Sequence, residues 1–166
     1  MDDNYNYYMF KCAEKNDLLG VIKCVEIFGA NVSYIHPNSG RTALYYAIHY
    51  KNTEMIDFLL NCNVDLIYKD DLKRSYFELA CNVKNIQFAK FLLEKGFDIN
   101  AVNVYGETSL FRAVYFEDIY IIRFLLEHGA DVTISTREGF SPLHIAALKD
   151  NRGIYLLLLK ANHDIS

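Results

Sequence analysis

The chain has 166 residues, a length typical of one domain, of which 52% are hydrophobic and 23% charged. This composition argues against an intrinsically disordered chain, and the formal net charge of −4 argues against a nucleic-acid-binding surface. The N-terminal sequence MDDNYNYY is unlike a secretory signal, and the longest apolar run, residues 154–159, is far shorter than the ~20 residues of a membrane span. We therefore expect a cytoplasmic or nuclear protein that binds neither nucleic acid nor a membrane.

The four cysteines are Cys12, Cys24, Cys62 and Cys81, and no two of them have the C-x-x-C spacing of a zinc or redox site. We expect them to be buried free thiols in a reducing compartment.

A repeat with a period of 33 residues dominates the sequence. Ala47, Ala80, Ala113 and Ala146 are each separated by that interval, and the segments around them read TALYYAI, SYFELAC, TSLFRAV and SPLHIAA. A leucine pair follows twelve and thirteen residues after each alanine, and then NVD, GFD, GAD or NHD. The period predicts four structural repeats in register.

A fifth copy lies upstream, where Ala13 aligns with Ala47 and Val25 takes the first leucine position. The sequence GAN follows at residues 29–31. Because Ala13 and Ala47 are 34 residues apart, we expect one inserted residue, in the loop that contains Pro37.

Each copy predicts two helices. The first begins after a Ser or Thr that caps exposed N–H groups, and its apolar residues, such as Leu44 and Ile48, have helical spacing. The second is exemplified by residues 119–126 and ends near a glycine such as Gly96 or Gly129. One such pair is too small to bury both faces, so stability must come from stacking in a single domain, residues 1–166. The predicted copies span approximately residues 5–35, 36–69, 70–102, 103–135 and 136–166.

The period, together with T-P-L-H-x-A and L-L-x-x-G-A-D patterns, resembles the ankyrin repeat. The best copy is GFSPLHIAA at residues 139–147, and the resemblance extends over residues 5–166. It implies an all-α fold, an α-solenoid of about five ankyrin repeats with helix-turn-helix units and hairpin-like loops. It also implies a non-catalytic protein that binds a partner protein.

The histidine of the ankyrin motif is present only at His144, because Tyr45, Glu78 and Phe111 replace it in other copies. In ankyrin repeats this histidine is structural and bonds to the neighbouring loop. We therefore expect a weaker polar network between these repeats than in an ideal array.

The resemblance places partner binding on the concave face, at the loop tips and just after each first helix. The matching positions are rich in large apolar side chains and arginines, which are frequent in protein interfaces. We expect the site to centre on Tyr105, Tyr115 and Phe116. The alternative is that these aromatics only reflect a composition rich in residues with AT-rich codons. The predicted partner-binding residues are Arg41, His49, Tyr50, Leu72, Arg74, Val104, Tyr105, Tyr115, Phe116, Arg137, Phe140 and Leu148.

The last copy differs from the others on its outer side, where Leu156 stands at a position that earlier copies give to a charged residue. Three interpretations remain open. The chain is cut from a longer array, the last helix is rotated with Leu156 inward, or this end pairs with another molecule, including a second copy of the chain.

No nucleotide-binding loop or hydrolase motif is present, and His128 and His163 are not spaced as metal ligands. We expect no enzyme, no cofactor and no metal site. Residues 92–100, LLEKGFDIN, resemble the ankyrin sequence that asparaginyl hydroxylases accept, which makes Asn100 a candidate for modification.

The AT-rich composition and the segment ALYYAI are similar to ankyrin proteins of poxviruses. That resemblance implies a host-range or immune-evasion factor in the host cytoplasm. The poxviral type often ends in an F-box-like tail, and none follows Asp164, so if the chain is complete we do not expect a ubiquitin-ligase adaptor. The alternative is a regulatory or scaffold ankyrin protein, or a fragment of a longer array, from an AT-rich protist or bacterium.

Overall fold

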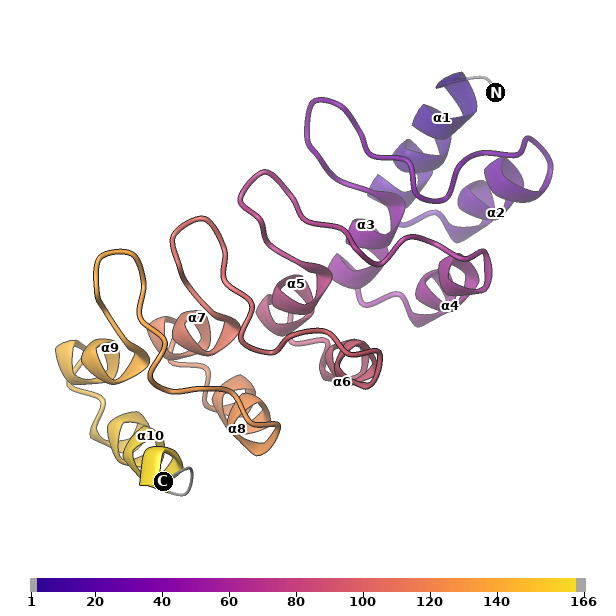
Figure 1. Cartoon of the computed structure of the whole chain (residues 1–166). Coiled ribbons are helices and arrows are strands. Elements are labelled where there is room, and N and C mark those ends of the chain that lie inside the picture. The colour runs from indigo at the N-terminus through magenta and orange to yellow at the C-terminus, as the bar shows by residue number, and fades with distance from the viewer. Residues whose placement is uncertain (1–2, 164–166) are drawn as a thin grey trace. The chain divides into compact units, whose positions relative to one another are not determined.

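The computed structural model describes residues 3–163, which contain ten α-helices and no strand (Figure 1). The predicted all-α repeat fold is confirmed. The chain divides into two compact units, one ending at Asp71 and the other beginning at Leu72, and each is described by itself. None of the described helices has the length and apolar character needed to cross a bilayer.

The first unit holds two helix pairs, α1 (Asp3–Glu14) with α2 (Leu18–Glu26) and α3 (Ala43–His49) with α4 (Thr53–Asn61). The helices of each pair pack on one another. The pairs stack through α1 against α3 and α2 against α4.

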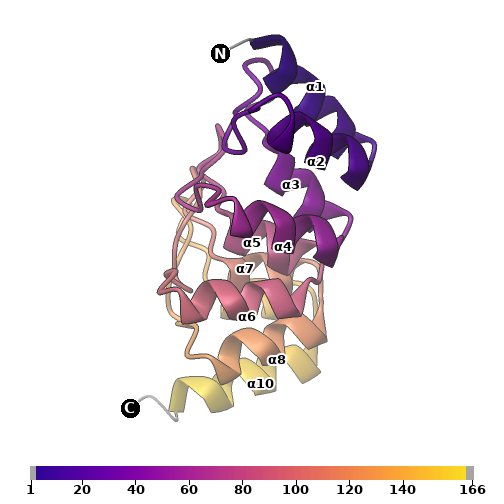
Figure 2. The same cartoon turned by 90° about the vertical axis from the view of Figure 1, so that its right-hand side faces the viewer.

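The second unit holds three helix pairs. Helices α5, α7 and α9 form one row and α6, α8 and α10 a second row, while the loops before α7 and α9 project to one side (Figures 1 and 2). Neighbours in the first row are in contact, as are the two helices of each pair. The six helices are α5 (Tyr76–Asn82), α6 (Ile86–Glu94), α7 (Ser109–Tyr115), α8 (Ile119–Glu127), α9 (Pro142–Leu148) and α10 (Arg152–His163).

The predicted helix caps are present. In four copies the side-chain oxygen of a Ser or Thr accepts a hydrogen bond, 3.0 to 3.4 Å long, from the backbone N–H three residues later. These caps are Thr42, Ser75, Thr108 and Ser141. The second helices have caps as well, which the sequence reading missed. They are Asp17, Asn52, Asn85, Asp118 and Asn151.

The core follows the repeat. The four aligned alanines are buried, and the first leucine of each pair is fully buried between the helices. The second leucine of each pair is only half-buried. Burial of a leucine side chain contributes about 1.5–3 kcal/mol, so the period-33 leucines are a main source of stability.

The register predicted for the first copy is wrong by one residue. The Asp17 N–H donates to the Cys12 carbonyl as the Asn52 N–H donates to the Ala47 carbonyl, so Cys12, and not Ala13, is equivalent to Ala47. The Ala30 N–H donates to the Cys24 carbonyl as the Val64 N–H donates to the Leu59 carbonyl. Cys24, and not Val25, is therefore equivalent to the buried leucine. The first copy has one extra residue after α2, in addition to the inserted residue expected near Pro37. The extra residue after α2 shifted the alignment, because that alignment was anchored on GAN.

Three further expectations need correction. Cys12 and Cys62 are partly exposed, and only the other two cysteines are buried. Leu156 is 53% exposed, so the interpretation that it turns inward is wrong. His144 Nδ1 accepts from the N–H of its own cap, Ser141, at 3.0 Å, and within the described residues His144 makes no hydrogen bond to a neighbouring loop.

Candidate functional site

Three exposed aromatic residues of the second unit, Tyr105, Tyr115 and Phe140, line one open hollow, here called the aromatic groove, with a volume of about 660 Å³. Its floor is formed by the buried side chains of Phe111 and Ile145, and its walls include Tyr115, which is 50% exposed, and Leu148, which is 72% exposed. The groove lies between the loop tips and helices α7 and α9. Its lining residues are Val104, Tyr105, Glu107, Phe111, Tyr115, Thr136, Arg137, Glu138, Phe140, Ile145 and Leu148.

The loop before α7 is held by Asn103, a buried polar residue. Its Oδ1 accepts from the N–H groups of Tyr105 (2.9 Å) and Glu107 (3.1 Å), and its Nδ2 donates to Glu107 Oε2 (2.8 Å). These bonds fix the backbone that carries Tyr105. The Tyr105 side chain is therefore presented to solvent from an ordered turn.

Successive loops of the second unit are joined by backbone hydrogen bonds. The Val104 N–H donates to the Leu72 carbonyl at 2.9 Å, and the Arg137 N–H donates to the Tyr105 carbonyl at 3.0 Å. Gly106 lies in this ladder with a positive φ of 77°. The loop tips that line the aromatic groove are therefore held in fixed register with one another.

Tyr115 and Phe116 end α7 side by side, with ring centres 5.3 Å apart and nearly perpendicular planes. The Lys149 ammonium lies 4.8 Å from the centre of the Tyr115 ring and 3.6 Å from a carboxylate oxygen of Glu117. The cation and its partners hold the wall of the aromatic groove in place.

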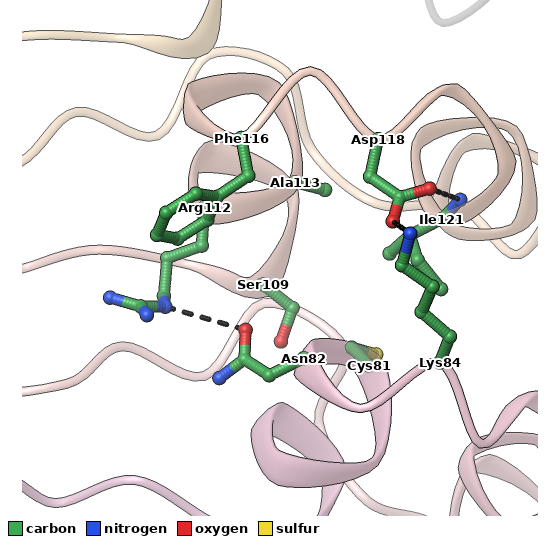
Figure 3. Close-up of a pocket in the computed structure, with 9 residues that line it drawn as sticks. All are labelled: Cys81, Asn82, Lys84, Ser109, Arg112, Ala113, Phe116, Asp118 and Ile121. Carbon is green, nitrogen blue, oxygen red and sulfur yellow. Dashed lines mark hydrogen bonds and ion pairs between the residues drawn. The ribbon is translucent and has the colours of Figure 1, made fainter.

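Phe116 lines a different hollow, here called the Arg112 pocket, with a volume of about 400 Å³ (Figure 3). The Arg112 guanidinium lies 5.5 Å from the centre of the Phe116 ring. It is within hydrogen-bonding distance of Asn82 and Glu107. It also lies 3.3 Å from a carboxylate oxygen of the buried Glu78. Glu78 replaces the motif histidine in its copy, so this ion pair to the next first helix supplies a polar contact between repeats.

A second ion pair closes the far side of the Arg112 pocket, where Lys84 lies 2.7 Å from Asp118 (Figure 3). Burial alone would raise the pKa of Asp118. Hydrogen bonds from Lys84 and from the backbone N–H of Ile121 outweigh burial and hold this pKa below its usual value. Because its charges are paired, the pocket offers no free charge for an ionic ligand.

Arg41 and Tyr50, in the first unit, are engaged in contacts of their own. The Arg41 guanidinium lies 4.7 Å from the Tyr45 ring centre and donates to the Tyr46 hydroxyl at 3.4 Å. The Tyr50 hydroxyl donates to the Glu14 carbonyl at 3.0 Å, although its ring stays exposed. His49 is exposed and stacks beside Tyr45, with 6.2 Å between ring centres.

The structure therefore brings only part of the predicted site together. The predicted residues of the aromatic groove are Val104, Tyr105, Tyr115, Arg137, Phe140 and Leu148. Phe116 lines the adjoining pocket, and Arg74 is half-buried. Sequence reasoning missed the floor residues, because it treated Phe111 only as a replacement of the motif histidine and Ile145 only as part of the repeated segment SPLHIAA.

Asn100 has a structural contact. Its Oδ1 accepts a hydrogen bond of 2.9 Å from the Asp131 N–H of the next copy, and its side chain is half-buried. The hydroxylation of Asn100 stays a prediction.

The described part of the chain contains no group of three His, Cys, Asp or Glu side chains arranged to hold a metal ion. A family model described as ankyrin repeats (3 copies) matches residues 8–103 and 77–166. This chain belongs to the ankyrin repeat family. Such repeats are in general protein–protein interaction modules and are typically non-enzymatic. A sequence search of curated proteins found no match.

Proposed function

We propose that this protein binds a partner protein in the aromatic groove. The observation that carries the proposal is the concentration of exposed rings over a buried apolar floor. Tyr105, Tyr115 and Phe140 are all exposed and line the same hollow, together with Leu148. Contiguous exposed apolar surface of this kind marks interaction sites.

The chemistry of the aromatic groove suits recognition of an extended apolar segment. Tyrosine and arginine are frequent among the residues whose truncation costs a complex about 2 kcal/mol or more. The rim carries Arg137 and Glu138 side by side, so opposite charges border the same opening. A partner segment with apolar side chains and mixed polar flanks fits this arrangement better than a uniformly acidic or basic one.

The first unit, taken by itself, carries further proposed partner-binding residues. Arg41, His49 and Tyr50 are exposed, and their own hydrogen bonds and ring contacts limit their freedom. Side chains that are already ordered lose less entropy when a partner binds. We assign to them a supporting role and to the aromatic groove the larger share of the affinity.

The cellular role that we favour is interference with host signalling by a viral protein in the host cytoplasm, with access to the nucleus. Support comes only from the composition and from the similarity of ALYYAI to poxviral ankyrin proteins. A regulatory ankyrin protein of a protist or bacterium uses the same mechanism with a different partner. Self-association near the exposed Leu156 is a separate proposal, tested by the mass of the protein in solution.

Affinity capture with quantitative mass spectrometry tests the proposed function. The bait variants are the wild type, Tyr105→Ala/Tyr115→Ala, and Tyr120→Ala as the control. Tyr120 is 79% exposed on α8, outside the aromatic groove, so its loss changes composition without changing the site. We expect a protein that the wild type and the control retain and the double variant loses. Equal retention by all three folded baits would show that the aromatics merely reflect composition.

A further inference from the structure

Two cysteines of the first unit face each other across a helix pair. Cys12, on α1, and Cys24, on α2, stand where the other copies have a small buried alanine and a buried leucine. In an antiparallel helix pair each Cα–Cβ bond inclines toward the N-terminus of its own helix. The side chain of Cys12 therefore inclines away from the connecting turn and that of Cys24 toward it, so the two thiols converge.

Gly20 provides the space in which the Cys12 thiol lies. A Cβ atom added at Gly20 would be 2.5 Å from Cys12 Sγ, which shows that the sulfur lies directly over the glycine. The equivalent position, three residues after the helix cap, is occupied by the buried Met55, Phe88 and Ile121 in other copies. Cys12 is larger than the alanine of the other copies, and Gly20 is smaller than the residue at its equivalent position. The two changes in side-chain volume therefore compensate one another.

The electrostatics agree with this geometry, since each thiol contributes to the pKa shift of the other. Cys12 is partly exposed and Cys24 is buried beside it. The buried Cys81 differs, because burial raises its pKa to about 12. An oxidant therefore has access to Cys12, while the thiol that resolves the product lies next to it.

We propose that Cys12 and Cys24 form a reversible intramolecular disulfide when the protein meets a peroxide. The Cys12 thiolate attacks one peroxide oxygen, the O–O bond breaks, and a sulfenic acid forms as one water leaves. The Cys24 sulfur then attacks the Cys12 sulfur, the S–S bond forms, and a second water leaves. Two thiols lose two electrons and two protons in total, which reduce one hydrogen peroxide to two waters. A dithiol reductant reverses the bond by exchange.

The disulfide would lock α1 to α2. It closes a short loop of chain between residues 12 and 24, which restricts the unfolded state and stabilises the first repeat. Burial raises the pKa of both thiols. For Cys12 the charge of Asp17 raises it further, while Cys24 and Lys15 lower it. Oxidation should therefore be slow at neutral pH and faster as the pH rises.

The test uses the full chain treated with hydrogen peroxide, followed by alkylation of the remaining thiols and digestion with trypsin. Cleavage after lysine and arginine places the two cysteines in peptides 12–15 and 24–41. We expect these peptides to be joined, the thermal midpoint of the protein to rise by several degrees, and dithiothreitol to reverse both changes. Sulfinic acid at Cys12, or a disulfide-linked dimer, in place of the joined peptides would overturn the proposal.

Two variants separate the disulfide from other effects of oxidation. Cys24→Leu restores the residue of the other copies, and circular dichroism confirms its fold. In this variant peroxide should no longer raise the thermal midpoint, and a persistent rise would overturn the proposal. Asp17→Asn retains a side chain that caps α2 and removes the negative charge near Cys12, so it should speed disulfide formation several-fold. An unchanged or slower rate would contradict the assigned geometry.

Discussion

Replacement of Gly106 by alanine tests how the loops that carry the aromatic groove are held. Gly106 has a φ of 77°, a conformation that disfavours residues with a side chain. A Cβ atom at this position would lie 2.9 Å from the backbone nitrogen of Arg137 and 3.2 Å from the Cα of Thr136. Both contacts are to backbone atoms of the neighbouring loop, so relief requires the two loops to separate.

Gly139 is the matched control, because it occupies the same loop position one repeat later. Its φ is 85°, and nothing lies within 4 Å of its added Cβ. An alanine in this conformation costs about 1–2 kcal/mol at either position. At Gly106 the separation of the loops also weakens the bond between the Arg137 N–H and the Tyr105 carbonyl, which adds about 1 kcal/mol. The expected losses are about 2–3 kcal/mol for Gly106→Ala and about 1–2 kcal/mol for Gly139→Ala.

Urea denaturation followed by circular dichroism measures both losses. The reasoning predicts that Gly106→Ala has the lower free energy of unfolding, by about 1 kcal/mol, with the same dependence on urea. Equal values for the two variants would refute it, because they would show that the loops move apart without cost.

Three further predictions concern stability. Arg112→Met should cost about 2–4 kcal/mol in urea denaturation, because it removes the ion pair of the buried Glu78; a loss below about 1 kcal/mol would contradict this role. Asp118→Asn keeps a helix cap but loses the Lys84 pair. The ion pair should contribute about 0.5–1 kcal/mol to the free energy of unfolding. Because the pKa of Asp118 is lower in the folded state, this contribution is present at pH values above the unfolded pKa. It disappears as the pH falls through the folded pKa. The wild type and this variant should therefore differ at neutral pH and converge in acid, and a constant difference would be inconsistent. Ile122→Ala should cost about 2–5 kcal/mol in the same assay, since the side chain is fully buried, and a near-zero change would refute that burial.

Much of the fold follows from local chemistry that repeats along the chain. A Ser or Thr such as Thr108 satisfies the N–H groups of the helix that follows it, and a leucine such as Leu125 lies on the buried side of the next helix. Both signals recur with the period of 33 residues, which made the helices predictable. The register of the first copy was not predictable, because Cys12 takes the place of an alanine and an extra residue after α2 lengthens the copy.

The aromatic groove was predictable in part for a related reason. Tyr105 and Tyr115 occupy repeat positions that face solvent in the family, so the period located them. The floor was not visible, because whether Phe111 closes a hollow depends on its packing against the next repeat. Phe116 follows Tyr115 directly in sequence but reaches Arg112 instead, since adjacent residues at a helix end point in different directions.

The central claim is that the aromatic groove binds a partner protein, and an affinity measurement tests it most directly. Isothermal titration of the captured partner would compare the wild type with Tyr115→Ala and Tyr120→Ala. We predict that Tyr115→Ala weakens binding about 30-fold, equivalent to about 2 kcal/mol, while Tyr120→Ala stays within about twofold of the wild type. Unchanged affinity of a folded Tyr115→Ala variant, or an equal loss in the Tyr120→Ala control, would contradict the claim.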